Sequence, residues 1–154
     1  MLSSEFKEHL KQNGLDPHVI DLINYYAIEI ALLSFNEFLR TECDMNYSLD
    51  ELTNLQDLSF GYNQLTSVPA EICHLPNLQY LSLDNNQLTS VPAEIGHLTN
   101  LQVLSLYDNE LTSLPAEICN LTNLQKLFLE YNQLTSLPAK IEHQSKQRGT
   151  RIYF

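Results

Sequence analysis

The chain has 154 residues, of which 44% are apolar, and its 19 acidic and 8 basic residues give a net charge of −11. This length suits one domain, the apolar share excludes an intrinsically disordered chain, and three cysteines are too few for a disulfide scaffold. The acidic balance argues against a nucleic-acid partner, because proteins that bind nucleic acid carry basic surfaces. Leucine accounts for 29 residues, so it replaces other apolar residues within an ordinary apolar total.

Residues 1–51 precede a set of sequence repeats and are predicted to form a helical N-terminal cap. The first predicted helix has an apolar face made of three residues: Leu2, Phe6 and Leu10. Asn13-Gly14 ends this helix, because glycine readily adopts the backbone conformation that follows a helix.

A second, longer helix is predicted from about Pro17 to Arg40, either continuous or broken in its middle. Asp16 supplies an N-cap, and proline suits the first helical position. Apolar residues that alternate over 28–32 would also fit a strand. The length of the segment and a polar stripe along it favour the helix.

Residues 52–143 consist of four units of 23 residues that follow one another without a gap. The units are Leu52–His74, Leu75–His97, Leu98–Asn120 and Leu121–His143. Leucine or phenylalanine recurs at positions 1, 4, 7, 9 and 14 of each unit, valine or leucine at 17, proline at 18 and isoleucine at 21. Asparagine fills position 12 in every unit: Asn63, Asn86, Asn109 and Asn132.

Each unit is predicted to contain a short strand, a tight corner and an irregular return. Positions 7 and 9 alternate as buried strand residues do, and the asparagine that follows can bond the backbone of the turn. Proline at position 18 favours an extended connection. One unit cannot bury enough apolar surface to offset the entropy of ordering its residues. Stacked units pair their strands in parallel, which predicts an α/β solenoid with a parallel sheet on one face.

The pattern LxxLxxLxLxxNxLxxLPxxI, in phase over residues 52–143, closely resembles the leucine-rich repeat family in its 23-residue form with the LPxEI return. Bacterial and intracellular signalling members are the most similar. The resemblance implies a short right-handed solenoid in which strand positions 6, 8, 10 and 11 line a concave sheet. It also implies a binding scaffold, although this family serves many different partners.

These concave positions carry aromatic and acidic side chains that the leucine core does not need. The ten candidate partner-binding residues are Asp57, Tyr62, Tyr80, Asp84, Tyr107, Asp108, Lys126, Phe128, Glu130 and Tyr131. Exposed tyrosine offers a large apolar area and a polar group at small entropic cost, which is typical of binding hot spots. Aromatic pairs that only stabilise the sheet are the alternative. Acids among the rings favour a protein partner with a basic patch.

The phase of the repeats extends weakly beyond both ends of residues 52–143. Four residues match core positions of neighbouring units: Met45 and Leu49 before the repeats, and Thr150 and Ile152 after them. Residues 41–51 are therefore a candidate half repeat. Residues 144–154 hold three bases and no acid, and form either an edge strand that covers Leu127 and Leu129 or a frayed basic tail.

Two further columns lie on the return side of the units. Position 20 forms an acidic ridge with one lysine, which a solvated face explains best: Glu71, Glu94, Glu117 and Lys140. Position 23 is rich in histidine and follows two of the cysteines: His74, His97, Asn120 and His143, with Cys73 and Cys119. We predict no metal, cofactor or disulfide there, because about 10 Å separates cysteines two repeats apart and Gly96 indicates a narrow slot between them.

The motifs GxSxG and HExxH and a phosphate-binding glycine loop are absent from the sequence, so an enzyme is not expected. The predicted function is a non-catalytic protein–protein interaction module, with a bacterial effector acting in a host cell as a hypothesis from the resemblance. Alternatives are a peptide or small-ligand sensor, and a regulator that contacts an enzyme through its cap or ridge.

The expected setting is a reducing, cytoplasmic one, because the number of cysteines is odd and no signal-peptide pattern is present. Export into a host cell by a route that needs no signal peptide fits the same features. No run of 18 residues is free of charge, so membrane insertion is not expected.

Overall fold

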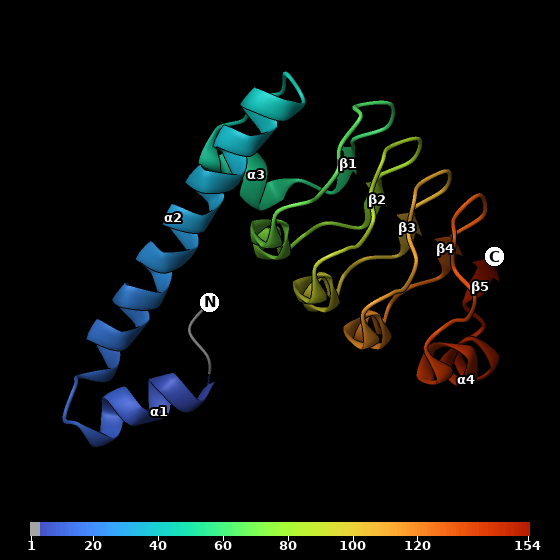
Figure 1. Cartoon of the computed structure of the whole chain (residues 1–154). Helices are drawn as coiled ribbons and strands as arrows, with labels where there is room; N and C mark the ends of the chain where they lie inside the picture. The colour runs from blue at the N-terminus through green and yellow to red at the C-terminus, as the bar shows by residue number, and fades with distance from the viewer. Residues whose placement is uncertain (1–3) are drawn as a thin grey trace.

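The computed structural model describes residues 4–154, except for the side chains of residues 4–6, 142 and 144. Helices form its N-terminal end, and a stack of similar coils forms the rest (Figure 1). Three α-helices come first: α1 (Ser4–Gln12), α2 (Pro17–Glu42) and α3 (Leu49–Asn54). Each coil then packs mainly on the coil before it and the coil after it. The predicted α/β solenoid with a helical N-terminal cap is confirmed.

Five short strands form one parallel sheet along one side of the coils. In chain order they are β1 (Asp57–Ser59), β2 (Tyr80–Ser82), β3 (Val103–Ser105), β4 (Lys126–Phe128) and β5 (Arg151–Tyr153). Neighbouring strands pair in sequence order, and Leu58 of β1 faces Leu81 of β2, which lies 23 positions later. The same step relates β2 to β3 and β3 to β4, so the sequence repeat is also the spatial repeat.

Short helices form the opposite side of the coils. Three are 3₁₀-helices and the last is an α-helix: η1 (Ala70–His74), η2 (Ala93–His97), η3 (Ala116–Asn120) and α4 (Ala139–Arg148). Pro69, Pro92 and Pro115 precede the three 3₁₀-helices in extended conformation. The extended connection predicted at position 18 is therefore confirmed.

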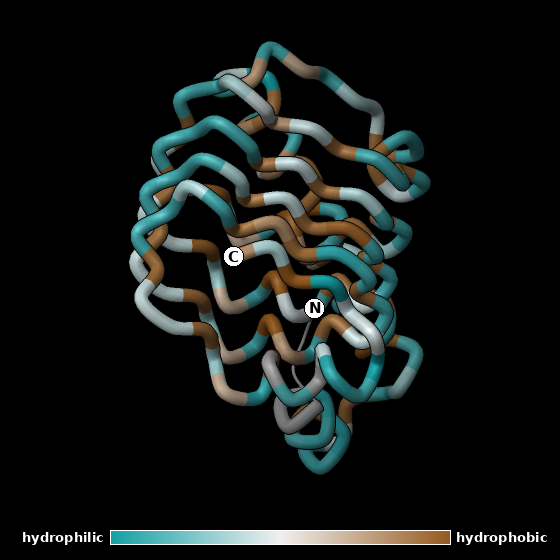
Figure 2. Tube along the Cα trace, turned by 90° about the vertical axis from the view of Figure 1, so that its right-hand side faces the viewer, coloured by the Kyte–Doolittle hydropathy of each residue, from teal (hydrophilic) through white to brown (hydrophobic). Residues whose placement is uncertain are grey.

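Leucine side chains fill the space between the sheet and the helices. The four leucines at position 7 are at most 2% exposed: Leu58, Leu81, Leu104 and Leu127. Figure 2 shows hydrophobic residues at corresponding places on successive coils. Full burial of one such side chain contributes about 1.5–3 kcal/mol, and each leucine needs the adjacent coil to become buried. Each unit consequently depends on contacts with its neighbouring units for its stability.

The asparagines at position 12 form a ladder along the stack. The side chain of Asn109 donates from Nδ2 to the carbonyls of Leu83 (2.9 Å) and Leu106 (3.2 Å). Its Oδ1 accepts from the backbone N–H of Leu88 at 3.1 Å. Asn86 makes the equivalent bonds one coil earlier. The prediction that these asparagines bond the backbone of the turns is confirmed.

Gly96 lies where two 3₁₀-helices come closest. A Cβ added at this residue would meet the backbone carbonyl oxygen of Glu117 at 2.4 Å. Such a distance is too short for any side chain without movement of η3. The narrow slot predicted at this position is therefore confirmed.

Helix α2 runs without a break from Pro17 to Glu42, so the predicted helix is confirmed and the alternative strand over 28–32 is wrong. The Asp16 carboxylate accepts a 2.7 Å hydrogen bond from the backbone N–H of His18 and caps the helix. One face of α2 packs on η1 and on the leucine core. The helix thus covers the first coil, which has no preceding coil to cover it.

Helix α1 ends just before Asn13-Gly14, as predicted, and Gly14 has a φ of +81°. Leu2 and the side chain of Phe6 lie outside the described residues, so the predicted apolar face of this helix is not described.

Residues 41–51 do not form the predicted half repeat. Helix α2 takes the place beside η1 that another 3₁₀-helix would occupy. Ser48 and Glu51 instead form a capping box that starts α3, and this helix continues to Asn54 inside the first unit. Met45 and Leu49 pack against the core at its edge.

The last residues of the chain form the edge strand β5. Ile152 faces Leu127, which is position 7, so the assignment of Thr150 to that position is wrong. Helix α4 has 10 residues where the 3₁₀-helices have 5, and the strand consequently begins two residues later. Gly149, with a φ of +74°, ends α4 in the left-handed conformation that glycine adopts readily.

Candidate functional site

The ten candidate residues lie on the exposed face of the sheet or at the turns that follow its strands. Each of the four repeat strands contains only positions 6, 7 and 8 of its unit, and position 7 points into the core. The sheet places the residues of position 6 in one row across the strands, and Arg151 extends it: Asp57, Tyr80, Val103, Lys126 and Arg151. The backbone of the sheet is thus the same in each unit, whereas the exposed side chains differ from one strand to the next.

Position 11 of each unit lies at the turn beyond the strand. All four residues there have a left-handed backbone, with φ between +53° and +63°: Tyr62, Asn85, Asp108 and Tyr131. This conformation costs an ordinary residue roughly 1 kcal/mol or more, so the ladder of asparagines next to it must hold the turn. The residues of this position therefore lie at the rim of the sheet, beyond the ends of its strands.

The aromatic rings form two pairs at the C-terminal end of the sheet. The rings of Tyr107 and Tyr131 meet edge to face with centroids 5.0 Å apart. Those of Phe128 and Tyr153 are stacked with centroids 4.6 Å apart. Tyr62 is 80% exposed and, within the described part of the chain, makes no ring contact. The single aromatic surface predicted from the columns is thus concentrated on the last three strands.

Tyr107, Asp108, Glu130 and Tyr131 form a cluster that we call the aromatic–acidic patch. The backbone N–H of Asp108 donates to the carbonyl of Glu130 at 3.0 Å, which holds the third and fourth turns side by side. Tyr131 is 70% exposed, while Tyr107 is half-buried against it. Desolvation, the Tyr131 phenol and the charge of Asp108 all raise the pKa of Tyr107 above its ordinary value.

Glu130 carries an unusual carboxylate within this patch. Its Oε2 atom is shielded from solvent and has no hydrogen-bond partner among the described residues. A buried acceptor without a donor costs about 1–3 kcal/mol, and more when it is charged. A cationic group of a partner placed beside this carboxylate would offset part of that cost through its charge.

Tyr153 belongs to this face but is not among the predicted residues. It stacks on Phe128 because β5 lies two residues later than the repeat phase indicates. The aromatic residues at 153 and 154 follow the basic tail, and this was the only sequence signal for such a contact. The ring of Tyr153 therefore covers one face of the Phe128 ring. This agrees with the alternative that aromatic pairs only stabilise the sheet.

The other candidate residues have different environments. The carboxylate of Asp84 accepts bonds from the Ser82 hydroxyl (2.9 Å) and from the backbone N–H of Tyr107 (3.1 Å), so it has a structural role within the sheet. Asp57 is exposed at the first end of the position 6 row, and Lys126 is exposed on the fourth strand. Lys126 faces Arg151, which makes the C-terminal end of that row basic.

The histidine and cysteine column lies on the helical side of the coils. The Cys73 sulfur is 3.5 Å from Nδ1 of His74, and burial raises the pKa of the thiol and lowers that of the imidazole. Burial, with the charge of Glu42, also raises the pKa of Cys43 to about 11. None of these thiols is activated as a nucleophile, since only the thiolate reacts. The described residues contain no group of three or more side chains suited to a metal ion.

The acidic ridge follows the same helical side. Its members belong to the three 3₁₀-helices and α4: Glu71, Glu94, Glu117 and Lys140. Glu94 and Glu117 are exposed, so water can solvate their charges.

The leucine-rich coils form a parallel sheet whose exposed face carries different side chains in each coil. This arrangement is that of a solenoid binding scaffold. A family model described as a leucine-rich repeat region matches residues 31–145. The chain belongs to the leucine-rich repeat family. No curated protein matches the chain significantly.

Similar solved structures support the assignment to this family. A leucine-rich repeat protein of Leptospira interrogans is 43% identical over 69% of this chain and 27% of that one, with a TM-score of 0.59. The plant peptide hormone receptor RGFR1, solved in complex with RGF2, is 36% identical over 66% of this chain and 17% of that one, with a TM-score of 0.56. The internalin InlF of Listeria monocytogenes is 27% identical over 70% of this chain and 31% of that one, with a TM-score of 0.54. The chain thus spans less than a third of the length of each.

Proposed function

We propose that this protein is a non-catalytic binding module that holds a protein partner against the aromatic–acidic patch. Leucine-rich repeat proteins generally mediate protein–protein interaction, and the patch is the surface that we propose for this role. The observation that carries the proposal is the Glu130 carboxylate beside the exposed ring of Tyr131. Its shielded Oε2 has no hydrogen-bond donor within the part of the chain that the structure describes.

The chemistry of the patch favours a lysine or arginine of the partner. A guanidinium donates charge-assisted hydrogen bonds to a carboxylate and also stacks on an aromatic ring. Glu130 and Tyr131 are neighbours in sequence and offer both groups together. The net charge of −11 attracts a basic surface from a distance and raises the rate of encounter.

Substitution of the patch tests this proposal. We expect Tyr131→Ala combined with Glu130→Gln to reduce capture of the partner from a cell lysate at least about 10-fold, the effect of losing a binding hot spot. Capture by the unmodified chain should also weaken as salt is raised, because salt screens the attraction between charges.

Tyr62→Ala is the matched control, since Tyr62 has the same position in the first unit and lies outside the patch. Equal capture by the patch variant and the unmodified chain, with both folded by circular dichroism, would rule out the patch. Loss of capture in the Tyr62 variant alone would indicate that the partner binds at the N-terminal coils instead.

We also propose a reducing site of action, with action of a bacterial protein inside a host cell as its most specific form. The support is the similarity to bacterial leucine-rich repeat proteins and the presence of three cysteines without a disulfide in the described residues. Fractionation of infected host cells, probed with an antibody to this chain, tests it. Recovery from the bacterial pellet alone would contradict the host-cell form.

A further inference from the structure

Helix α2 has apolar side chains on two opposite faces. On one face Leu32, Phe35 and Leu39 are at most 2% exposed and pack in the core. The other face carries six apolar side chains that are 41–65% exposed, which we call the α2 stripe: Val19, Leu22, Ile23, Tyr26, Ile30 and Leu33. In Figure 1, α2 stands at the end of the stack with the coils on one side of it. The stripe therefore lies on the side turned away from the solenoid.

The spacing of the α2 stripe is that of a helix–helix contact. Val19, Leu22, Tyr26, Ile30 and Leu33 follow one another at steps of 3, 4, 4 and 3 residues. At about 100° per residue these steps keep the side chains on one side of the helix, about 160° from the buried face. The stripe is about 21 Å long at 1.5 Å per residue.

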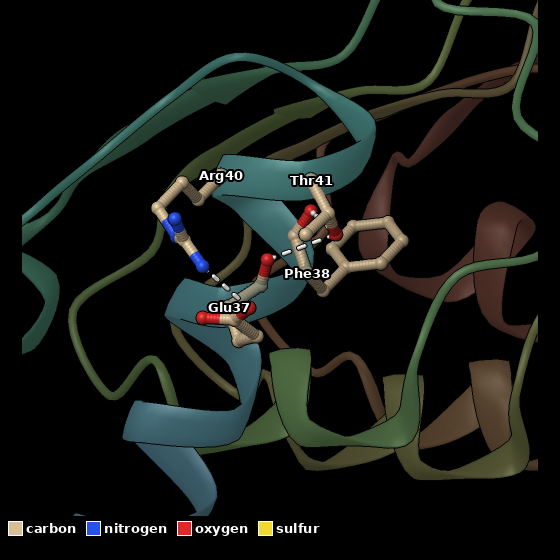
Figure 3. Close-up of polar contacts among 4 residues, drawn as sticks. All are labelled: Glu37, Phe38, Arg40 and Thr41. Carbon is tan, nitrogen blue, oxygen red and sulfur yellow. Dashed lines mark hydrogen bonds and ion pairs between the residues drawn. The ribbon is translucent and has the colours of Figure 1, made fainter.

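Charged groups lie at the C-terminal end of the stripe and, at Glu29, along one edge of it. One turn beyond Leu33, Arg40 forms a 2.6 Å ion pair with Glu37, and both side chains are 61% exposed (Figure 3). Thr41 donates to the carbonyl of Glu37 at 2.9 Å in the same turn. The polar turn limits the apolar surface to the N-terminal two-thirds of α2.

We infer that the α2 stripe binds the same stripe of a second copy of this chain, in an antiparallel helix pair. Six side chains at these exposures present on the order of 500 Å² per copy, and two copies reach the ~1,000 Å² that a specific interface needs. Small side chains flank one edge of the stripe, at Ala27 and Ser34, and leave room for a second helix. No charged side chain of the stripe would be buried by this pairing.

The antiparallel arrangement follows from the position of the solenoid. The core contacts of α2 lie in its C-terminal half, so parallel helices would bring two acidic solenoids side by side. Antiparallel helices place them at opposite ends of the pair, where repulsion between charges of −11 is smallest. The stripe is centred on Tyr26, and a two-fold axis there brings this residue next to its own copy.

A lipid surface is the other chemistry that would cover such a stripe. Helix α2 is long enough and apolar enough to cross a membrane by length and composition. Its opposite face, however, holds the first coil, and crossing a bilayer would remove Phe35 and Leu39 from the core. Two apolar faces on one soluble helix explain the high hydropathy without a membrane.

Sedimentation velocity on the full chain tests the inference. We expect the unmodified protein to sediment with twice its mass of 17.7 kDa, and the variant Tyr26→Glu with Ile30→Glu to sediment with 17.7 kDa. Both substituted side chains are more than half exposed, so the fold should be kept and the circular dichroism spectrum unchanged. Phe154→Glu is the matched control, because Phe154 is also exposed but lies at the other end of the chain.

Cysteine cross-linking tests the orientation. Tyr26→Cys should form a disulfide between two chains under mild oxidation, whereas Val19→Cys should not, because Val19 would face Leu33 of the other copy. Cross-linking by both variants would overturn the antiparallel arrangement. A monomeric unmodified chain at every concentration, or a dimer that persists in the double glutamate variant, would overturn the inference. A monomer that binds phosphatidylcholine vesicles through the stripe would assign it to lipid instead.

Discussion

Replacement of Asn109 by alanine should lower the free energy of unfolding by about 3–5 kcal/mol. The substitution removes three donated contacts, to the carbonyls of Leu83, Leu106 and Tyr107, and one accepted bond at a site that is only 7% exposed. It leaves the N–H of Leu88 and the carbonyls of Leu83 and Leu106 without this partner in the interior of the stack. Denaturation with urea, followed by circular dichroism, measures the loss.

Asn63→Ala provides the control in the same column. Asn63 belongs to the first coil, and its side chain donates one bond of 3.3 Å to the carbonyl of Gly61. We expect a loss below about 1 kcal/mol for this variant, as for a single weak hydrogen bond. Equal losses at Asn63 and Asn109 would mean that the ladder does not stabilise the stack.

Replacement of Phe35 by alanine should cost a similar amount, about 3–5 kcal/mol. Phe35 is fully buried. Its ring centroid lies 6.0 Å from that of Phe38 and 6.5 Å from that of Phe60. Phe60 lies in the first coil, so this cluster attaches the cap to the solenoid. The loss should appear in the same urea experiment.

Phe154→Ala removes an equally large ring from an exposed site and should change stability by less than about 0.5 kcal/mol. A loss at Phe35 that is no greater than this would show that the helical cap does not depend on the core for its position.

The repeated part of the fold could be predicted because one local pattern recurs in phase. Leucine, asparagine and proline recur at fixed positions of each unit. Position 12 therefore identified asparagines that bond the turns, and position 18 identified the extended connection. Helix α2 was predictable for a different reason, since Asp16-Pro17 starts it and its length excludes a strand. These signals are short-range and need no knowledge of the tertiary contacts.

The ends of the solenoid were not predictable in the same way. Helix α4 replaces a 3₁₀-helix and takes up more residues, so the count of 23 no longer placed β5 or the Phe128–Tyr153 stack. The site was likewise only partly predictable. The columns gave Tyr107 and Tyr131, but not the left-handed turn at Tyr131 or the shielded oxygen of Glu130. Both depend on how neighbouring coils meet.

The ladder also limits how this chain can change in length. Its buried bonds join an asparagine to a carbonyl 26 residues earlier and to an amide 21 residues earlier, as Asn86 does with Phe60 and Leu65. Inserting a few residues between two asparagines would shift one partner of each bond that spans the insertion relative to the other partner. Insertion or deletion of a whole 23-residue unit keeps all of them. We therefore expect this fold to tolerate a change in the number of coils far better than a change in the size of one coil.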